Sequence, residues 1–416
     1  MEVSTAMPHY VVLKQALLFD GVDDTLVENA SVVVENGTVR EIKAGAVKRG
    51  AAEVIDLRGR FLMPGLLDLH FHAYSVSFDA LKLERMPKPL LVSHAVRLLE
   101  GALQRGFTTV RDPGGGEVGL ALAIEQGVIN GPRFFYGGKA LSQTGGHGDM
   151  RDPSHEELCR CRQSDAISQV VDGEDEIRKV CREELRKGAD HIKLFISGGV
   201  TSPSDPIWMR QFTDAEVRAA VEEAATRRKY VAAHCLTDEG ARRCVEHGIR
   251  SIEHGFGIEP ETARLIARSG KTFVVPTLAV LHQLREHTNE LGLSEASIRK
   301  IGGALESAHE GIRNCAKAGV KLGLGTDLFG PEYHAMQSRE FEFRSAVQKP
   351  IDVLRSATSI NAEIIQRKGE LGVVAPGAHA DLVALDGNPL KNMKLFARPG
   401  AMPLVMKAGR MIRCDL

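Results

Sequence analysis

One stretch decides the fold of this chain: Phe61-Leu-Met-Pro-Gly-Leu-Leu-Asp-Leu-His-Phe-His72. Its first seven residues form an apolar run typical of a buried strand, and Asp68 to His72 close that run. Residues two apart on a strand point to the same face, so we expect His70 and His72 to project together. Two imidazoles held in this way form half of a divalent-metal site, although the pattern alone is more often structural.

Later apolar runs carry further residues of metal-binding type. His234, His254 and Asp327 each stand at the end of such a run, and Lys193 lies within one. Imidazole and carboxylate groups are ligands that zinc and related ions prefer. The set therefore predicts a metallohydrolase.

A repeated pattern of helix, glycine and short apolar strand runs through the chain from about residue 90. The expected strands begin at Phe107, Arg133, His191, Tyr230, Ser251, Thr272 and Lys321. Together with the strand that ends at His72, these make eight β-α units. Continuously apolar strands separated by helices indicate a parallel sheet covered on both faces. We therefore predict an α/β chain with a (β/α)₈ TIM barrel whose site lies at the carboxyl ends of the strands.

The two ends of the chain follow a different pattern. Residues 10–57 and 380–413 alternate between apolar and polar side chains, and Asn36-Gly37 is a strong hairpin signal. Neither end has enough strands to be stable alone. We expect residues 1–62 and 372–416 to form one small β-sandwich domain, with the barrel at 63–371.

Composition excludes several classes of protein. The 416 residues are 43% hydrophobic and carry a net charge of −1, so no overall field favours nucleic acid or an anionic membrane. No apolar run approaches the ~20 residues that span a bilayer. The seven cysteines are an odd number, which indicates reduced thiols and a cytoplasmic location. Cys159 and Cys161 match no zinc pattern. We expect a homo-oligomer that acts on a small molecule.

In these motifs the chain resembles the amidohydrolase superfamily. His70-x-His72, Lys193, His234, His254 and Asp327 match its metal-site motif in order and in strand placement. The resemblance implies two divalent metal ions, expected to be zinc, with Lys193 carboxylated on its amine by CO₂ and bridging them. By the same resemblance, His70, His72 and Asp327 bind one ion, and His234 and His254 bind the other. Asp327 also takes a proton from the metal-bridging water and passes it to the leaving amine.

The branch of the superfamily follows from finer matches. Deaminases carry His-x-x-Glu after the fifth strand, but Thr237 stands where the glutamate belongs. The segments 141–149, 193–206 and 230–234 resemble bacterial prolidase-like dipeptidases and ochratoxinase-like amidohydrolases. That resemblance implies hydrolysis of dipeptides or N-acyl amino acids by a metal-bridged hydroxide, with His147 and Tyr230 touching the scissile carbonyl or the substrate carboxylate. The segment Ile207–Phe212 departs from these relatives, so a strict preference for proline does not follow.

Three long loops are expected over the catalytic face, at residues 139–172, 198–212 and 328–340. They carry Arg151, Arg210 and Arg339, whose guanidinium groups suit a substrate carboxylate. Two alternatives remain open from the sequence. One is a cyclic amidohydrolase or deaminase acting on a small ring, and the other is a non-catalytic scaffold on the same fold.

Overall fold

The computed structural model describes residues 10–47, 52–151, 167–202, 205–293 and 295–416, so Cys159 and Cys161 lie outside the described residues. The chain divides into two compact units. One contains Met1–Leu67, Leu103–Thr108 and Lys349–Leu416, and the other contains Asp68–Ala102 and Thr109–Gln348. None of the described helices combines the length and apolar character that crossing a bilayer requires.

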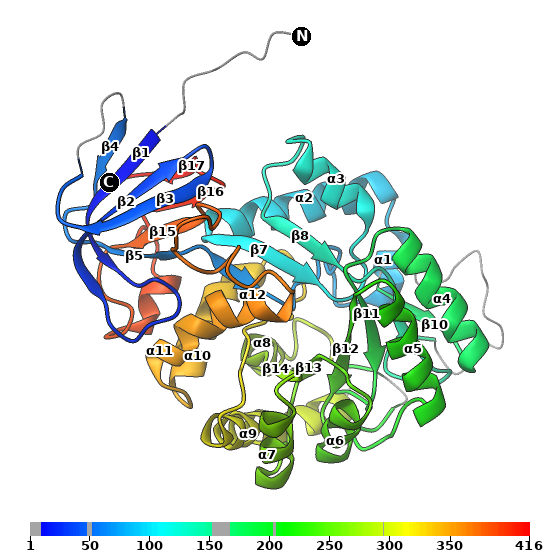
Figure 1. Cartoon of the computed structure of the whole chain (residues 1–416). Helices are drawn as coiled ribbons and strands as arrows, with labels where there is room; N and C mark the ends of the chain where they lie inside the picture. Colours follow the sequence, from blue (N-terminus) through cyan, green and yellow to red (C-terminus); the bar gives the residue numbers. More distant parts are fainter. Residues whose placement is uncertain (1–9, 48–51, 152–166, 203–204, 294) are drawn as a thin grey trace. The chain divides into compact units, whose positions relative to one another are not determined.

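The first unit is built on an eight-stranded sheet to which both ends of the chain contribute (Figure 1). The strand order is β17-β16-β15-β5-β1-β2-β3, and β4 pairs with β1. The strands are β1 (Tyr10–Leu18), β2 (Val27–Glu35), β3 (Thr38–Ala44), β4 (Glu53–Asp56), β5 (Phe61–Pro64), β15 (Leu382–Leu385), β16 (Leu404–Lys407) and β17 (Arg410–Cys414). Strands from the two ends meet where β5 pairs with β15. The two-layer sandwich and the boundaries at 62/63 and 371/372 stay predictions.

The hairpin predicted at Asn36-Gly37 is confirmed. Glu35 pairs with Thr38 across the turn between β2 and β3, and both turn residues have positive φ, 47° for Asn36 and 86° for Gly37. Two positive φ angles in a two-residue turn match the twist of the flanking strands. The remaining elements of this unit are α11 (Pro350–Arg355), a π-helical turn (Ser356–Ile360), α12 (Asn361–Ile364) and a 3₁₀ turn (Met393–Ala397).

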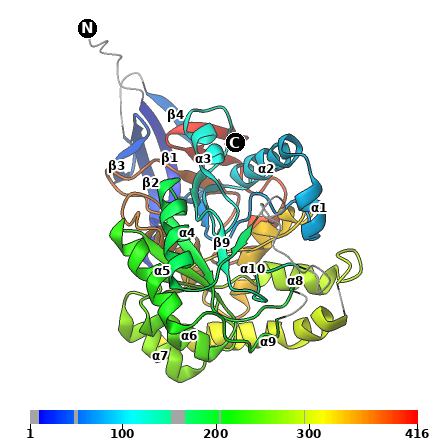
Figure 2. The same cartoon turned by 90° about the vertical axis from the view of Figure 1, so that its right-hand side faces the viewer.

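The second unit alternates strands and helices (Figure 2). Its strands are β8 (Arg133–Tyr136), β9 (Ala140–Ser142), β10 (Ser168–Val170), β11 (His191–Phe195), β12 (Tyr230–Cys235), β13 (Ser251–His254) and β14 (Phe273–Val275), while β6 (Leu66–Asp68) and β7 (Phe107–Asp112) begin in the first unit. Its helices are α1 (Ala80–Arg85), α2 (Lys88–Gln104), α3 (Val118–Glu125), α4 (Glu174–Arg186), α5 (Asp214–Thr226), α6 (Asp238–Glu246), α7 (Pro260–Ser269), α8 (Leu278–Glu286), α9 (Glu295–Ala318), α10 (Glu340–Ser345) and a 3₁₀ turn (His334–Arg339).

Local signals in the sequence mark where several of these helices begin and end. Thr213 and Glu216 form the capping box that opens α5, and Pro260 occupies the first turn of α7. Gly188, which follows α4, has a φ of 96°, and Gly270, which follows α7, has a φ of 62°. Glycine adopts this left-handed conformation without the steric cost that a Cβ would impose.

Backbone hydrogen bonds join the strands of the second unit into a ring. Strands β11, β12, β13 and β14 pair in parallel and in order, and β7 pairs in parallel with β8. The Asp190 amide donates to the Tyr136 carbonyl (2.8 Å), which connects β8 to the start of β11. The Phe71 amide donates to the Arg111 carbonyl (3.1 Å), which adds the segment after β6. The α/β, TIM-barrel-like fold is confirmed.

The eighth position of the ring differs from the prediction. Residues 321–325 form no regular strand, and only Leu322 makes a bridge, to Val274. The segment still closes the ring, because the Gly323 amide donates to the Val274 carbonyl (2.7 Å) and the Leu69 amide donates to the Leu324 carbonyl (2.9 Å). A Cβ at Gly325 would lie 2.6 Å from the Cβ of His70. Glycine therefore allows this segment to approach His70 closely, and the segment does not form a regular β-ladder there.

Candidate metal centre

The six residues predicted as a metal site come together at one end of the ring. His70 and His72 follow β6, Lys193 lies within β11, His234 and His254 lie at the ends of β12 and β13, and Asp327 follows the closing segment. All six line one cavity of about 310 Å³. Parallel strands bring their carboxyl ends to the same face of a barrel, which is why residues so distant in sequence meet here.

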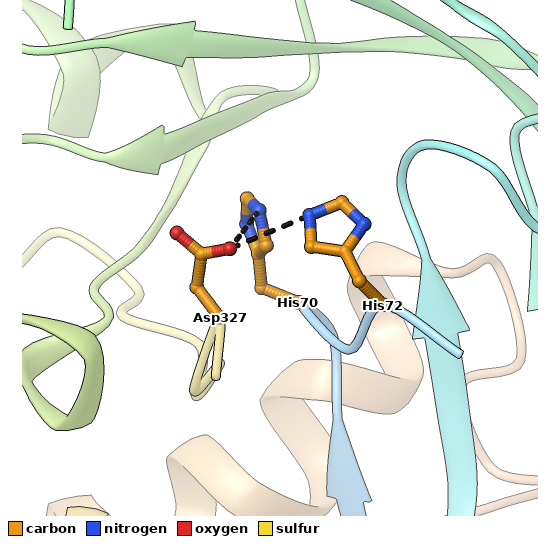
Figure 3. Close-up of side chains that lie close together, drawn as sticks. All are labelled: His70, His72 and Asp327. Atoms are coloured by element: carbon orange, nitrogen blue, oxygen red, sulfur yellow. Dashed lines mark ion pairs between the residues drawn. The ribbon is translucent and has the colours of Figure 1, made fainter. Parts of the chain in front are cut away.

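His70, His72 and Asp327 form the tightest group (Figure 3). Oδ1 of Asp327 lies 3.5 Å from Nε2 of His70 and 3.4 Å from Nε2 of His72. One ligand atom from each residue lies within 4.8 Å of the others. Two imidazole nitrogens and a carboxylate converging on one point form a ligand set suited to a zinc-like ion.

His234 and His254 stand beside this group. The ring centroid of His254 lies 4.8 Å from that of His70 and 4.7 Å from that of His234. One nitrogen of each ring has a partner: Nδ1 of His254 lies 2.8 Å from the Thr277 hydroxyl, and Nε2 of His234 lies 3.2 Å from the Gly198 carbonyl oxygen. The second nitrogen of each ring remains as a ligand for an ion, and its partnered nitrogen holds the ring in place.

The backbone is strained at two of the candidate ligands. His254 has a φ of 70° and Asp327 has a φ of 57°. A side chain with a Cβ in this left-handed region costs free energy, and such residues collect at functional sites where the surrounding structure enforces them. His254 is the last residue of β13 and Asp327 follows the closing segment, and both side chains line the cavity.

Glu253 holds the imidazole of His70 in place, and sequence reasoning missed it. Its Oε2 lies 2.8 Å from Nδ1 of His70, and its Oε1 accepts hydrogen bonds from Arg111 (2.6 Å) and Ser251 (2.6 Å). Arg111 also donates to the Leu69 carbonyl (2.6 Å). The available signal was a charged residue inside the buried run Ser251-Ile-Glu-His254.

Two further buried carboxylates, also missed, fix the loops that carry the histidines. Asp68 accepts hydrogen bonds from the His70 amide (3.1 Å) and from the Thr326 hydroxyl (2.6 Å). Asp112 accepts one from the Ala73 amide (2.8 Å), and its Oδ1 lies 3.5 Å from Nδ1 of His72. These contacts leave the ligating side chains little freedom before an ion binds.

Burial sets the protonation of most of the cluster. It lowers the pKa of His70, His234 and His254 well below the usual imidazole range, and neighbouring cationic groups act in the same direction. Burial also lowers the pKa of Lys193 to about 8. His72 differs: burial would lower its pKa, but hydrogen bonds to Asp112 and Asp327 raise it to about 10. Neutral imidazoles offer the lone pairs that a metal ion needs.

Lys193 is the least ordinary member of the cluster. It is only 3% exposed, and among the described residues no carboxylate lies within ion-pair distance of its amine. Its Nζ lies 5.8 Å from the centroid of the Phe195 ring. Burying an unpaired ammonium costs free energy. The donor set of four imidazoles, one carboxylate and one neutralisable amine therefore fits a pair of divalent ions.

The two other predicted catalytic residues have different positions. His147 lines the cavity, and its ring stacks on His234 with 4.3 Å between centroids. Tyr230 does not line the described part of the cavity, and its ring stacks on His191 at the amino-terminal end of β12. Tyr230 shares a strand face with His234, but four residues at about 3.3 Å each place it roughly 13 Å further along the strand. That spacing separates the two backbone positions, and the contact of Tyr230 with a substrate stays a prediction.

The three predicted substrate arginines also do not line the described part of the cavity. Arg151 donates to the Asp149 carboxylate (2.7 Å), Arg210 pairs with Asp214 (2.8 Å), and Arg339 pairs with Glu286 (3.0 Å). Each guanidinium already forms an ion pair with a neighbouring carboxylate. The contact of Arg151, Arg210 and Arg339 with a substrate carboxylate stays a prediction without support from this geometry.

Apolar side chains make up most of the cavity wall away from the ligands. They are Phe78, Leu83, Met150, Ile167, Phe195, Val200, Leu236, Phe256, Val280, Leu281, Leu284 and Phe329. A mainly apolar pocket with a few converging polar groups is typical of a small-molecule site.

Comparison with known proteins gives consistent matches. The model of the amidohydrolase family matches residues 61–412. Ochratoxinase from Aspergillus niger is 32% identical over 370 residues, which cover 85% of this chain and 75% of that protein. The crystal structure of an amidohydrolase is 41% identical and covers 98% of this chain and 100% of its own, with a TM-score of 0.94. The crystal structure of a prolidase complexed with N-methylphosphonate-L-proline is 40% identical, with coverages of 97% and 100% and a TM-score of 0.93.

Proposed function

Because this chain belongs to the amidohydrolase family, we propose that it is a metal-dependent dipeptidase or amidase that cleaves the amide bond of dipeptides or N-acyl amino acids. One observation carries the proposal: all six residues of the ligand set line a single, mainly apolar cavity. The similarity to an ochratoxinase and to a prolidase supports an amide as the bond that is cleaved.

We propose two zinc ions as the cofactor. His70, His72 and Asp327 would hold one, His234 and His254 the other, and Lys193, carboxylated by CO₂, would join them. When bound, such ions polarise a carbonyl and ionise water near neutral pH. The amine of Lys193 is buried and its pKa is lowered to about 8, which favours the neutral form that adds CO₂, releases one proton and becomes an anionic carbamate. Such an anion would suit a place beside two cations.

The chain's own residues supply proton transfer and orientation. Asp327 has one carboxylate oxygen between His70 and His72, and its Oδ2 lies 3.9 Å from Nδ1 of His254. A carboxylate at this point of the cavity is placed to take a proton from the attacking water and give it to the leaving amine. His147, which stacks on His234 and lines the cavity, is placed to contact the amide of the substrate.

The cavity wall supports apolar groups on the substrate. Phe78, Phe329 and Leu284 are among its apolar side chains, so burial of an apolar side chain or of a proline ring adds binding free energy. We propose apolar residues or proline on the leaving amino acid.

A substrate panel tests the function. Purified, zinc-loaded enzyme supplied with bicarbonate is assayed on Xaa-Pro, Xaa-Phe and Xaa-Arg dipeptides, N-acyl amino acids, a dihydropyrimidine-type cyclic amide and an aminopurine nucleoside. Turnover of dipeptides or N-acyl amino acids alone is the expected result. Turnover confined to the ring substrates would establish the alternative of a cyclic amidohydrolase or deaminase. If the metal-loaded protein cleaves none of these compounds, the result would favour the alternative of a non-catalytic scaffold.

We also propose that residues 1–62 and 372–416 form a two-layer β-sandwich domain, with the barrel at 63–371, and that the protein is a homo-oligomer. Pairing of β5 with β15 supports the joint domain. Light scattering of the protein as it elutes from a size-exclusion column measures the oligomeric state.

A further inference from the structure

The imidazole of His147 is held on one side by a buried polar cluster that the mechanism above does not use. Nδ1 of His147 lies 2.8 Å from the hydroxyl of Ser202 and 3.2 Å from Oδ2 of Asp205. Ser202 is 2% exposed and Asp205 is fully buried. Among the described residues, no hydrogen bond involves Nε2 of His147, and the residue lines the cavity.

The hydrogen bonds in this cluster determine where the imidazole proton lies. The Ser202 hydroxyl donates to Oδ1 of Asp205, so its proton is not available to His147. Oδ2 of Asp205 can only accept, and it already accepts from the Gly199 amide (2.9 Å) and from Gln211 (3.3 Å). Both partners of Nδ1 are therefore acceptors, and Nδ1 must carry a proton.

The loop that presents Asp205 is itself fixed. The amine of Lys300, on α9, donates to the carbonyl oxygens of Gly199 (3.0 Å) and Asp205 (2.8 Å). The His147 ring packs directly on Gly199, where any Cβ would overlap the ring atoms. The Gln211 side chain accepts from the His147 amide (3.1 Å), which ties the same loop to the main chain of His147. The imidazole is thus restrained in both position and rotation.

We propose that Asp205 is a positioning residue that fixes the proton of His147 on Nδ1, so that Nε2 is the atom presented to the substrate. That Nε2 contacts a substrate rests on the proposed function. The position of the proton on the His147 ring does not depend on it. A neutral His147 in this tautomer accepts a hydrogen bond through Nε2, which suits the N–H of a secondary amide, the scissile bond of a substrate whose leaving residue is not proline. It donates to a carbonyl oxygen only when it is doubly protonated, paired with Asp205.

Nuclear magnetic resonance of the full-length, zinc-loaded enzyme labelled with ¹⁵N-histidine tests the proposal. Spectra are recorded at a pH high enough to keep imidazoles neutral, and the His147 signals are assigned by their loss in His147→Gln. We expect Nδ1 protonated and Nε2 unprotonated in the wild type. Asp205→Asn should abolish this single pattern, because the amide can donate to Nδ1. Ser202→Ala should retain it, because Asp205 still accepts.

The control is Asp149→Asn, a second buried aspartate of the site loops that binds Arg151 and the Gly145 amide instead of the His147 ring. It should leave the His147 signals unchanged. On a substrate found in the panel, Asp205→Asn should lower kcat/KM by about 10- to 100-fold at wild-type zinc content, the range seen for residues that orient active-site imidazoles. An Nε2–H tautomer in the wild type, or an unchanged His147 pattern in Asp205→Asn, would overturn the proposal. Absence of any turnover would instead count against the proposed function, since the spectra decide the tautomer without a substrate.

Discussion

The carboxylate of Glu253 joins the candidate metal ligand His70 to Arg111. Its Oε2 lies 2.8 Å from the imidazole of His70 and its Oε1 lies 2.6 Å from the guanidinium of Arg111, and the side chains of Glu253 and Arg111 are fully buried. Since Nδ1 of His70 donates to Glu253, Nε2 is left to face Asp327. Glu253 thus sets the orientation of a candidate metal ligand while compensating a buried cation.

Glu253→Gln should therefore affect both stability and metal binding. The glutamine still accepts from His70 but places an amide against Arg111, and breaking a buried ion pair in this way costs about 3–5 kcal/mol. Zinc affinity should fall by about 10- to 100-fold because His70 is less well oriented. Denaturant unfolding and zinc titration measure the two effects. Glu246→Gln, at an exposed position on α6, is the control and should change neither.

Removal of metal should abolish turnover. The candidate ligands His70, His72, His234 and His254 are held in place by neighbouring groups before an ion binds, so a chelator should empty the site without unfolding the barrel. Zinc added back should restore activity, and the metal content should approach two ions per chain by elemental analysis. Full activity in protein shown to be free of metal would refute the proposed mechanism.

Lys193→Ala should lose most of the activity. The substitution removes the group proposed to join the two ions and leaves space between them, so acetate or formate in solution should restore part of the rate. Mass spectrometry of the native wild type should reveal added CO₂ that is absent from the variant. An unmodified Lys193 beside two bound ions in an active enzyme would contradict carboxylation.

Asp327→Asn tests proton transfer. The amide oxygen can still contact an ion, but it cannot accept a proton, so kcat should fall by about 10²- to 10⁴-fold. Metal content is measured in parallel, because Asp327 is also a proposed ligand. A decrease of less than threefold at full metal content would place the proton acceptor elsewhere.

Blocking the substrate carboxylate tests the role proposed for the loop arginines. A hydrogen bond to a charged group contributes about 1.5–3 kcal/mol, so amidation of the substrate C-terminus should lower kcat/KM by about 10- to 100-fold. Changing the N-terminal residue should cost much less. Equal cleavage of free-acid and amidated substrates would show that no carboxylate contact exists, consistent with the ion pairs that already occupy Arg151, Arg210 and Arg339.

The sequence alone predicted the alternation of strands and helices, except at the closing segment 321–325, and the six candidate metal-site residues. Both follow from local physical chemistry: apolar runs bounded by glycine make buried strands, capping residues such as Thr213 begin helices, and parallel strands bring their carboxyl ends together. His70, His72, Lys193, His234, His254 and Asp327 could be identified because each stands in or just after such a strand.

Only the tertiary structure decided which groups surround that cluster. Strand alternation places Tyr230 and His234 on one face but does not measure distance along the barrel axis, so the predicted contact of Tyr230 with substrate stays a prediction. The closing segment packs closely against His70 at Gly325 and does not form a regular β-ladder with its neighbours. Glu253 and Asp205 act through hydrogen bonds to residues 183 and 58 positions away. A charged residue within a buried run, as at Glu253, indicates that a partner exists, but the identity of a long-range partner has no local sequence signal, because the contact arises when the ring closes and its loops pack.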